Sequence, residues 1–277
     1  MKKLFVVGII IFMVSVLATA QTVDEIIQKN LEARGGLDKI TAVKSGKLSG
    51  KILRQGMEMP ITMWYVKPDK IRTELTFSDK SMTFAYDGNI AWQISPFTGS
   101  TDPQEITGDM ADNIKENIES LNEPFIDYEK KGHKIEFIGK DEWEGTDVLK
   151  LKLTLKSGKV STIFIDAETF IELKRENVRS LDNGQEIRAE SLFGDYKPVD
   201  GVMMPHSISM TANGQKAGEI IFDSVETNVK TEDGFFSMPP KKEEKIEEKK
   251  EEKKEEEKEE EKEEEKEKTG KEGQTDG

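Results

Sequence analysis

Two histidines and many carboxylates are the side chains of this sequence that could perform acid–base or metal chemistry. The chain has no cysteine, which excludes thiolate catalysis, thiolate metal ligation and disulfides. His133 and His206 are far apart in the sequence, and neither belongs to an H-E-x-x-H or H-x-x-x-H spacing that would place two imidazoles on one helix face. No G-x-S-x-G nucleophile elbow or glycine-rich phosphate loop is present. These motifs therefore give no support to metal-dependent or nucleophilic catalysis.

The carboxylates cluster around Trp143, where Asp141, Glu142 and Glu144 could form the pair that a hydrolase uses as acid and base. Such a pair must face a cleft, whereas clusters like this one arise by chance in an acidic chain and also mark turns between strands. A hydrolase would need these carboxylates or His206 within hydrogen-bond reach of one another in a cleft. We therefore expect no enzyme, no cofactor and no metal site, and we hold the hydrolase as the least favoured hypothesis.

The charge of the chain limits the class of its partners. Its formal net charge is −14, and both the central part and the C-terminal tail are acidic. Proteins that bind nucleic acids need a basic patch to neutralise phosphates, and none is visible here. We expect no nucleic-acid partner.

The two ends of the chain differ from the middle and predict three segments. Lys2 and Lys3 precede a 14-residue apolar run and the small residues Ala18-Thr19-Ala20, which is typical of a secretory signal peptide cleaved after Ala20. The run is shorter than the roughly 20 residues of a spanning helix. Residues 241–277 are almost only Lys and Glu and predict a solvated tail with no packed core. Residues 21–240 remain as one exported, non-cytoplasmic domain.

The pattern of apolar residues within this domain predicts an α+β fold. Thr22 and Glu25 form a capping box before a helix, and a second amphipathic helix is predicted over 103–122. Elsewhere the apolar residues alternate with polar ones in short segments separated by Asp-Gly and Asn-Gly turns, which indicates antiparallel strands. A long sheet of this kind curls, so we expect a strongly curved, open half-barrel of about eleven strands with helices over its concave face.

Methionine is frequent in the domain: nine of the 11 methionines follow residue 20. Its flexible thioether side chain adapts to many shapes, so it suits a promiscuous apolar surface as well as an ordinary core. A curved sheet with an apolar interior and a helical cover is a natural cavity for a lipid-like ligand.

Several short motifs resemble those of the LolA-like periplasmic carriers that sort outer-membrane lipoproteins. The segment from Met63 to Arg72, MWYVKPDKIR, resembles the hairpin of that family in which a basic residue and a proline form the turn. The segment Asp87-Gly88-Asn89-Ile90-Ala91-Trp92 followed by Pro96 is similar to its D-G-x-x-x-W…P stretch. Later segments at 196–205 and 236–239 resemble the ends of related domains.

The resemblance implies a half-open, eleven-stranded barrel whose apolar cavity receives the acyl chains of lipoproteins. It also implies a lid held by an arginine just before the hairpin proline, where this chain has Lys67, which lacks the planar fork of arginine. We expect Lys67 to contact the lid. The cavity or its rim is expected to contain Met63, Trp64, Met82, Phe84, Trp92 and Phe97, and the inner face of the lid to contain Ile106, Met110, Ile114 and Ile118.

Two functions remain open beside the hydrolase. The favoured one is a monomeric periplasmic carrier or binding protein for lipoproteins or other acylated ligands, with an inner-membrane donor complex and an outer-membrane acceptor as partners. The alternative is a non-catalytic envelope sensor or scaffold of the same fold that binds another protein. It predicts a small or closed cavity and an exposed apolar patch elsewhere.

Overall fold

The computed structural model describes residues 21–97, 101–180 and 186–241 of the chain. The predicted signal peptide and almost all of the Lys/Glu tail lie outside the described residues. Among the described residues, no helix combines the length and the apolar character needed to cross a bilayer.

One antiparallel sheet of 13 strands forms most of the domain, so the curved sheet expected from the alternating pattern is confirmed. The strand order is β6-β5-β4-β3-β2-β1-β13-β12-β11-β10-β9-β8-β7. The bounds are β1 Ser45–Arg54, β2 Met57–Val66, β3 Lys70–Phe77, β4 Lys80–Tyr86, β5 Ala91–Ile94, β6 Gln104–Ile106, β7 Lys134–Trp143, β8 Thr146–Thr154, β9 Val160–Asp166, β10 Glu172–Ser180, β11 Glu186–Val199, β12 Val202–Ala212 and β13 Gln215–Thr227.

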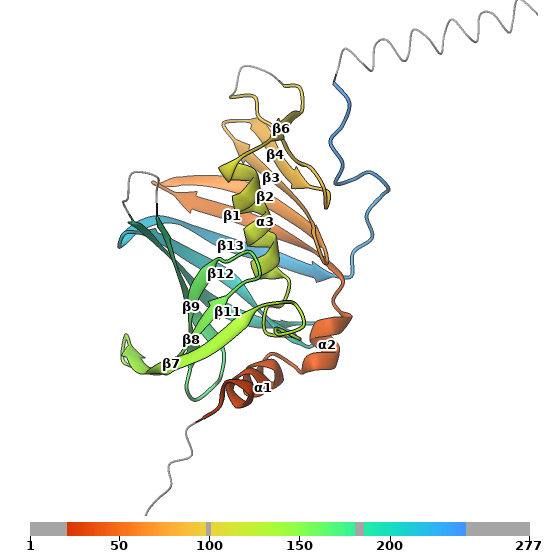
Figure 1. Ribbon diagram of the computed structural model, residues 1–277. Coiled ribbons are helices and arrows are strands. Elements are labelled where there is room, and N and C mark those ends of the chain that lie inside the picture. Colours follow the sequence, from red (N-terminus) through yellow and green to blue (C-terminus); the bar gives the residue numbers. More distant parts are fainter. Residues whose placement is uncertain (1–20, 98–100, 181–185, 242–277) are drawn as a thin grey trace, which may run out of the picture.

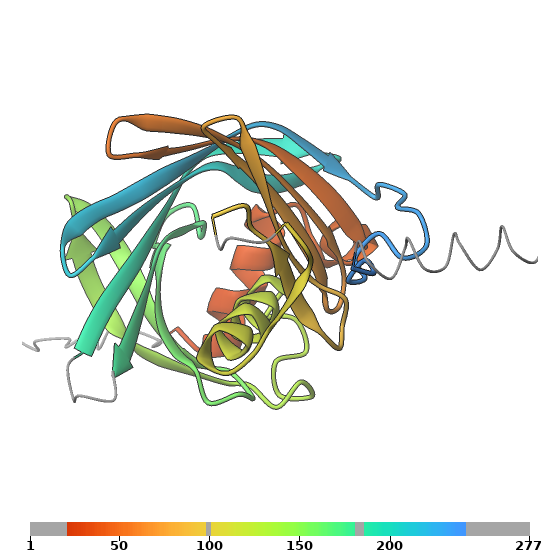
Figure 2. The same ribbon diagram turned by 90° about the horizontal axis from the view of Figure 1, so that it is seen from above.

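The path of the chain explains why the sheet stays open. Strands β1 to β6 extend the sheet in one direction, and the chain then crosses to the other edge, where β7 begins. Strands β7 to β13 return one by one until β13 pairs with β1, so β6 and β7 are the two edges of the sheet within the described residues. Figure 2 shows the result from above as a strongly curved sheet with the helices on its inner side.

Three helices cover the concave face. Helices α1 (Val23–Ala33) and α2 (Leu37–Ala42) lie at one end of the sheet, and α3 (Asp109–Leu121) belongs to the segment that crosses between the two edges (Figure 1). The predicted capping box is present: the Thr22 hydroxyl accepts a hydrogen bond from the Glu25 backbone, and the Glu25 carboxylate accepts one from Thr22. The first helix therefore begins where the sequence predicts.

The segment predicted as one helix over 103–122 is divided in the structure. Its first part, Gln104–Ile106, is strand β6, which pairs with β5, and the helix begins only at Asp109. Gly108 separates the two with a backbone φ of +63°, a conformation that other residues adopt reluctantly. Ile106 therefore lies in the sheet and not in the lid helix. Apolar spacing alone missed this strand because three residues are too few to show alternation.

Candidate ligand-binding cavity

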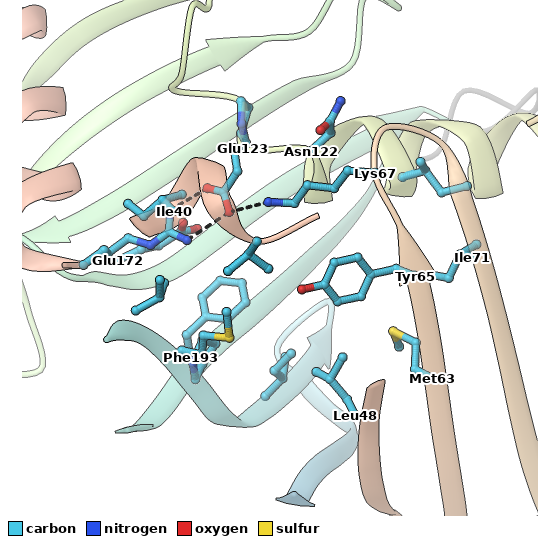
Figure 3. Close-up of a pocket in the computed structure, with 18 of the residues that line it drawn as sticks. Ile40, Leu48, Met63, Tyr65, Lys67, Ile71, Asn122, Glu123, Glu172 and Phe193 are labelled. Carbon is cyan, nitrogen blue, oxygen red and sulfur yellow. Dashed lines mark hydrogen bonds and ion pairs between the residues drawn. The ribbon is translucent and has the colours of Figure 1, made fainter. Parts of the chain in front are cut away.

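A cavity of about 310 Å³ lies between the concave face of the sheet and the helices. It is enclosed by side chains from α1, α2 and the end of α3 on one side and from β1, β2, β3 and β10 to β13 on the other. Most of its lining is apolar, including Ile40, Leu48, Met63, Ile71, Phe193 and Ile208. Figure 3 shows Leu48, Met63 and Phe193 together on the side of the cavity away from Glu123.

One half of the concave face is closely packed against the helices, and the other half lines the cavity. On β8 and β9, Leu149, Leu151 and Ile163 are fully buried in a cluster with residues of α1 and with Phe125. On the other half, the lining residues Leu48 and Met63 are only partly buried although they face inward. Protein interiors are normally packed to high density, so unfilled apolar surface inside the sheet indicates space for a ligand.

An ionic cluster formed by Arg34, Lys67 and Glu123 lies at one end of the cavity. The Arg34 guanidinium donates two hydrogen bonds to the Glu123 carboxylate, at 2.7 and 3.2 Å, and the Lys67 ammonium donates a third at 3.3 Å. The three side chains are only 17–23% exposed. Figure 3 shows Lys67 and Glu123 reaching toward each other from separate elements. The carboxylate that Lys67 contacts thus lies two positions after α3, in the loop that follows the helix.

Each member of this cluster is held in place by its own segment. Arg34 caps α1, and its carbonyl accepts a hydrogen bond from the Met203 backbone at 2.9 Å, which fixes the helix end against the start of β12. Lys67 lies in the turn between β2 and β3, and its backbone N–H donates to the Lys44 carbonyl at 2.8 Å. Glu123 follows α3 with a φ of +48°. The cluster therefore joins α1, the β2–β3 turn and the end of α3.

The environment sets the charge states of these groups. Burial disfavours the Glu123 carboxylate, but the adjacent Arg34 and Lys67 outweigh it, so the pKa of Glu123 is lowered. Burial, reinforced by the charge of Glu123, raises the pKa of the Tyr65 hydroxyl to about 12. Glu123 is therefore ionised at neutral pH, and Tyr65 is a neutral hydroxyl that lines the cavity beside it.

A second ion pair lines the cavity farther from the β2–β3 turn. Arg175 donates to Glu172 through two nitrogens at 2.8 and 2.9 Å, and the Tyr196 hydroxyl donates to the Glu172 carbonyl at 2.7 Å. Burial disfavours the charged guanidinium, but Glu172 outweighs it and the pKa of Arg175 is raised. This pair is internally neutral, so it contributes fixed polar groups without adding net charge to the cavity.

Met63, Lys67 and Ile118 are the residues predicted from the sequence that line the cavity. Phe84 and Met82 lie on β4 and share the concave face with Met63, but they are not part of the lining. Phe84 packs with Ile114 of α3 against a small cluster that contains Ile106 and Ala111. This cluster attaches α3 to the sheet, so these residues support the cover of the cavity.

Trp64 and Trp92 lie on the opposite face of the sheet from the cavity, contrary to the sequence prediction. The β2–β3 and β4–β5 registers place both on the face of Arg72, while Met63 and Tyr65 face inward. There the C-terminal segment covers them: the Trp92 indole donates to the Phe236 carbonyl at 2.8 Å, and Trp64 packs edge-on against Phe235. The predicted alternation of inward and outward residues is therefore correct, but these two tryptophans pack under the C-terminal segment on the face opposite the cavity.

Phe97 and Met110 are largely exposed and line no part of the cavity. Phe97 is 49% exposed and contacts Phe77, whereas Met110, at the start of α3, is 56% exposed. The apolar stripe of α3 that faces the interior contains Ala111, Ile114 and Ile118, and Met110 is not part of it. Met110 lies one position before Ala111, about 100° away around the helix, which takes it off that stripe.

Sequence reasoning missed Arg34, Tyr65 and Glu123 as cavity residues. Arg34 is the last residue before a Gly-Gly pair at the end of the first helix, and Tyr65 lies two positions from Met63 on the same strand face. Only Tyr65 had a usable signal, because period two assigns it to the side of Met63. Nothing in the sequence pairs Arg34 with a glutamate 89 positions later.

The side chains considered for catalysis lie elsewhere. His133 accepts a hydrogen bond from the Lys156 backbone at 3.0 Å, and His206 contacts the Met204 carbonyl at 3.1 Å. Asp141, an exposed residue of the edge strand β7, pairs with Lys150 of β8. None of these residues lines the cavity, and the described residues contain no group of His, Asp and Glu that could hold a metal ion.

The fold and the cavity together define an open antiparallel half-barrel whose concave face encloses an apolar cavity under helices. No protein-family model and no curated protein matches the chain. Among solved structures, a DUF1329 family protein from Desulfovibrio piger matches with a TM-score of 0.52 at 13% identity, over 76% of this chain and 95% of that one. A LolA superfamily protein from Nitrosomonas europaea matches with a TM-score of 0.50 at 13% identity, over 79% and 98%.

These likenesses establish the fold. The chain has a LolA-like fold, so the resemblance found in its short motifs is confirmed at the level of architecture. At 13% identity, the ligands of the similar proteins do not transfer to this chain.

Proposed function

We propose that this protein is a non-catalytic carrier or binding protein for acylated, apolar ligands, with lipoproteins as the leading class. The supporting observation is the unfilled half of the concave face: a cavity of about 310 Å³ whose apolar lining includes residues that are only partly buried under the helices. Ligand pockets commonly measure about 300–1,000 Å³, so this one has room for one slender chain in its present form. A ligand with several acyl chains requires the helices to move outward.

The same proposal places the protein in the periplasm as a monomer. The signal-like residues 1–20 direct export, and an inner-membrane donor and an outer-membrane acceptor supply and receive the ligand. The ionic cluster of Arg34, Lys67 and Glu123 holds the end of α3 over the cavity. Opening it is the step that admits or releases the chain.

Native mass spectrometry of the mature protein, purified without detergent, tests this proposal. We expect a co-purifying lipid or lipoprotein, or uptake of an added acyl ligand, identified after denaturation. A clean apo mass together with no uptake of any acyl ligand would contradict the proposal and favour a scaffold that binds another protein.

Leu48→Trp is expected to reduce the affinity for an acyl ligand by roughly tenfold or more, equal to about 1.4 kcal/mol. Leu48 points into the cavity from β1, and the larger ring occupies space that the ligand needs. Lys47→Trp is the matched control, since Lys47 is the adjacent residue on the same strand, pairs with Trp64 and faces the other side. Titration with a fluorescent fatty acid measures the affinity of both variants. Equal affinities of Leu48→Trp and Lys47→Trp would place the ligand outside this cavity.

A further inference from the structure

A second opening of about 280 Å³ adjoins the cavity at its charged end. It lies between α2, the β2–β3 turn and the loop after α3, and we call it the vestibule; it is lined by Ile40, Thr41, Val43, Lys44, Lys67, Pro68, Asn122, Glu123, Ile126 and Lys131. Lys44 and Pro68 are exposed, so the vestibule opens to solvent. The residues that line both spaces, and so separate them, are Ile40, Val43, Lys67, Pro68, Asn122 and Glu123.

The charge of the vestibule is strongly unbalanced. Three lysines, Lys44, Lys67 and Lys131, surround a single carboxylate, and that carboxylate is already bound by Arg34 from the other side. The Lys131 ammonium donates to the backbone carbonyls of Asn122 and Glu123, each at 2.8 Å, which leaves its charge without a carboxylate partner in those contacts.

The other charged groups nearby do not correct this imbalance. Asp127, which faces Lys131, forms its own ion pair with Lys130 at 2.7 Å. Among the residues that the structure describes, no carboxylate forms an ion pair with the exposed Lys44. Burial lowers the pKa of Lys131, which indicates that its positive charge is costly where it lies.

Such a concentration of positive charge is unexpected in this chain. The protein carries a formal net charge of −14, so the positive charge of the vestibule is local and not a property of the whole surface. Partly buried charges are stable when an opposite charge accompanies them, and clefts lined by one sign of charge concentrate the opposite ion. The vestibule is therefore suited to an anion.

We propose that the vestibule binds the anionic headgroup of an amphiphile whose acyl chain extends into the apolar cavity. The inference rests on the proposed function and, among its acylated ligands, favours amphiphiles with a phosphate or carboxylate next to the chain over lipoproteins. Both parts of the ligand then meet matching surfaces: the headgroup lies among Lys44, Lys67 and Lys131, and the chain passes Ile40 and Val43.

The geometry of the ionic cluster also provides a way for the ligand to enter. Arg34 binds Glu123 through two hydrogen bonds, the shorter at 2.7 Å, whereas Lys67 contributes one at 3.3 Å. Bidentate arginine–carboxylate pairs are stronger than single lysine contacts. An incoming headgroup therefore takes Lys67 as its partner while Glu123 stays bound to Arg34, and the barrier between the vestibule and the cavity opens.

Calorimetric titration of the mature protein with ligands of one chain length tests this proposal. The probes are palmitoyl lysophosphatidylglycerol and palmitate as anionic amphiphiles, palmitoyl lysophosphatidylcholine as a zwitterionic one, and inorganic phosphate alone. We expect the anionic amphiphiles to bind roughly tenfold more tightly than the zwitterionic one at low salt. The difference should shrink as salt rises, because the Debye length falls to about 10 Å at 0.1 M.

Lys44→Glu is the decisive variant because Lys44 is exposed and its loss should leave folding intact. It should abolish most of the roughly tenfold preference for the anionic amphiphiles and change the affinity for lysophosphatidylcholine by less than about twofold. Lys140→Glu on β7 makes the same change of charge at an exposed lysine away from the vestibule and should preserve the preference. Lys131→Gln, which removes one charge without reversing it, should give an intermediate loss.

The remaining outcomes separate this inference from the function on which it rests. Equal binding of anionic and zwitterionic amphiphiles, unchanged in Lys44→Glu, would overturn the headgroup site and leave the carrier proposal standing. Binding of inorganic phosphate alone as tight as that of lysophosphatidylglycerol would show a free-anion site and overturn the link to an acyl chain. Binding of none of the amphiphiles would overturn both.

Discussion

Glu123→Gln is expected to lower the free energy of unfolding at pH 7 by about 2–4 kcal/mol. The substitution leaves the Arg34 guanidinium and the Lys67 ammonium, both largely buried, without their carboxylate. Breaking a fully buried ion pair by removing one partner costs about 3–5 kcal/mol, and the partial exposure of this cluster reduces the penalty. The loss falls on the contact that joins α1, the β2–β3 turn and the end of α3, so the cover of the cavity should loosen as well.

The effect of this substitution should depend on pH in a defined direction. Because the pKa of Glu123 is lower in the folded protein than its ordinary value of 4.5, its contribution to stability is fully present above about pH 4.5. It is lost as the pH falls through the lowered folded-state pKa. The difference between wild type and Glu123→Gln should therefore be constant from pH 6 to 8 and should vanish in strong acid.

Urea unfolding at several pH values measures this difference. Glu129→Gln is the matched control, since Glu129 lies in the same loop but is exposed, and it should change the stability by less than about 0.5 kcal/mol. A Glu123→Gln protein as stable as wild type at pH 7 would show that the ionic cluster does not hold the loop after α3.

Trp92→Ala is expected to lower the free energy of unfolding by about 3–5 kcal/mol and to leave the affinity for an acyl ligand within about twofold of wild type. Trp92 is fully buried between the sheet and the C-terminal segment, where the Arg72 guanidinium lies 5.8 Å from its ring. Truncation leaves a large void between the sheet and the C-terminal segment and removes the hydrogen bond to the Phe236 carbonyl. The cavity on the concave face is not involved.

Trp92→Phe separates the contribution of the buried ring from that of the indole hydrogen bond. It keeps most of the buried ring and removes the indole N–H, so it should cost about 1–3 kcal/mol, as expected when a buried acceptor loses its donor. Thermal unfolding together with the fatty-acid titration measures stability and affinity on the same samples. A Trp92→Ala protein that keeps its stability but loses ligand affinity would place the ligand on the opposite face of the sheet from the one proposed.

Local patterns predicted most of the architecture. The capping box of Thr22 and Glu25 located the start of α1, and the alternation of apolar and polar residues predicted strands, of which β8, with Leu149, Leu151 and Leu153 in the core, is one. Helix capping and strand alternation depend on neighbours within a few residues, so a single sequence contains the information. Strand β6 was missed because it is short and is stabilised by its pairing with β5.

The direction of each strand face could not be predicted in the same way. Period two shows that Met63 and Trp64 point to opposite sides, but it does not show which side the helices cover. Both are large and apolar because both faces of this part of the sheet are covered: the concave face by helices, and the other face by the C-terminal segment with Phe235 and Phe236. That second cover is what placed Trp64 and Trp92 away from the cavity.

The sequence by itself determined the class of this protein: an acidic, cysteine-free α+β chain with an alternating sheet, amphipathic helices and a signal-like start. Only the tertiary structure decided where the cavity lies and which charges surround it. Arg34, Lys67 and Glu123 are brought together because β13 pairs with β1 and the segment containing α3 crosses the open sheet. Contacts between residues so far apart depend on how the whole sheet curves, which no local pattern encodes.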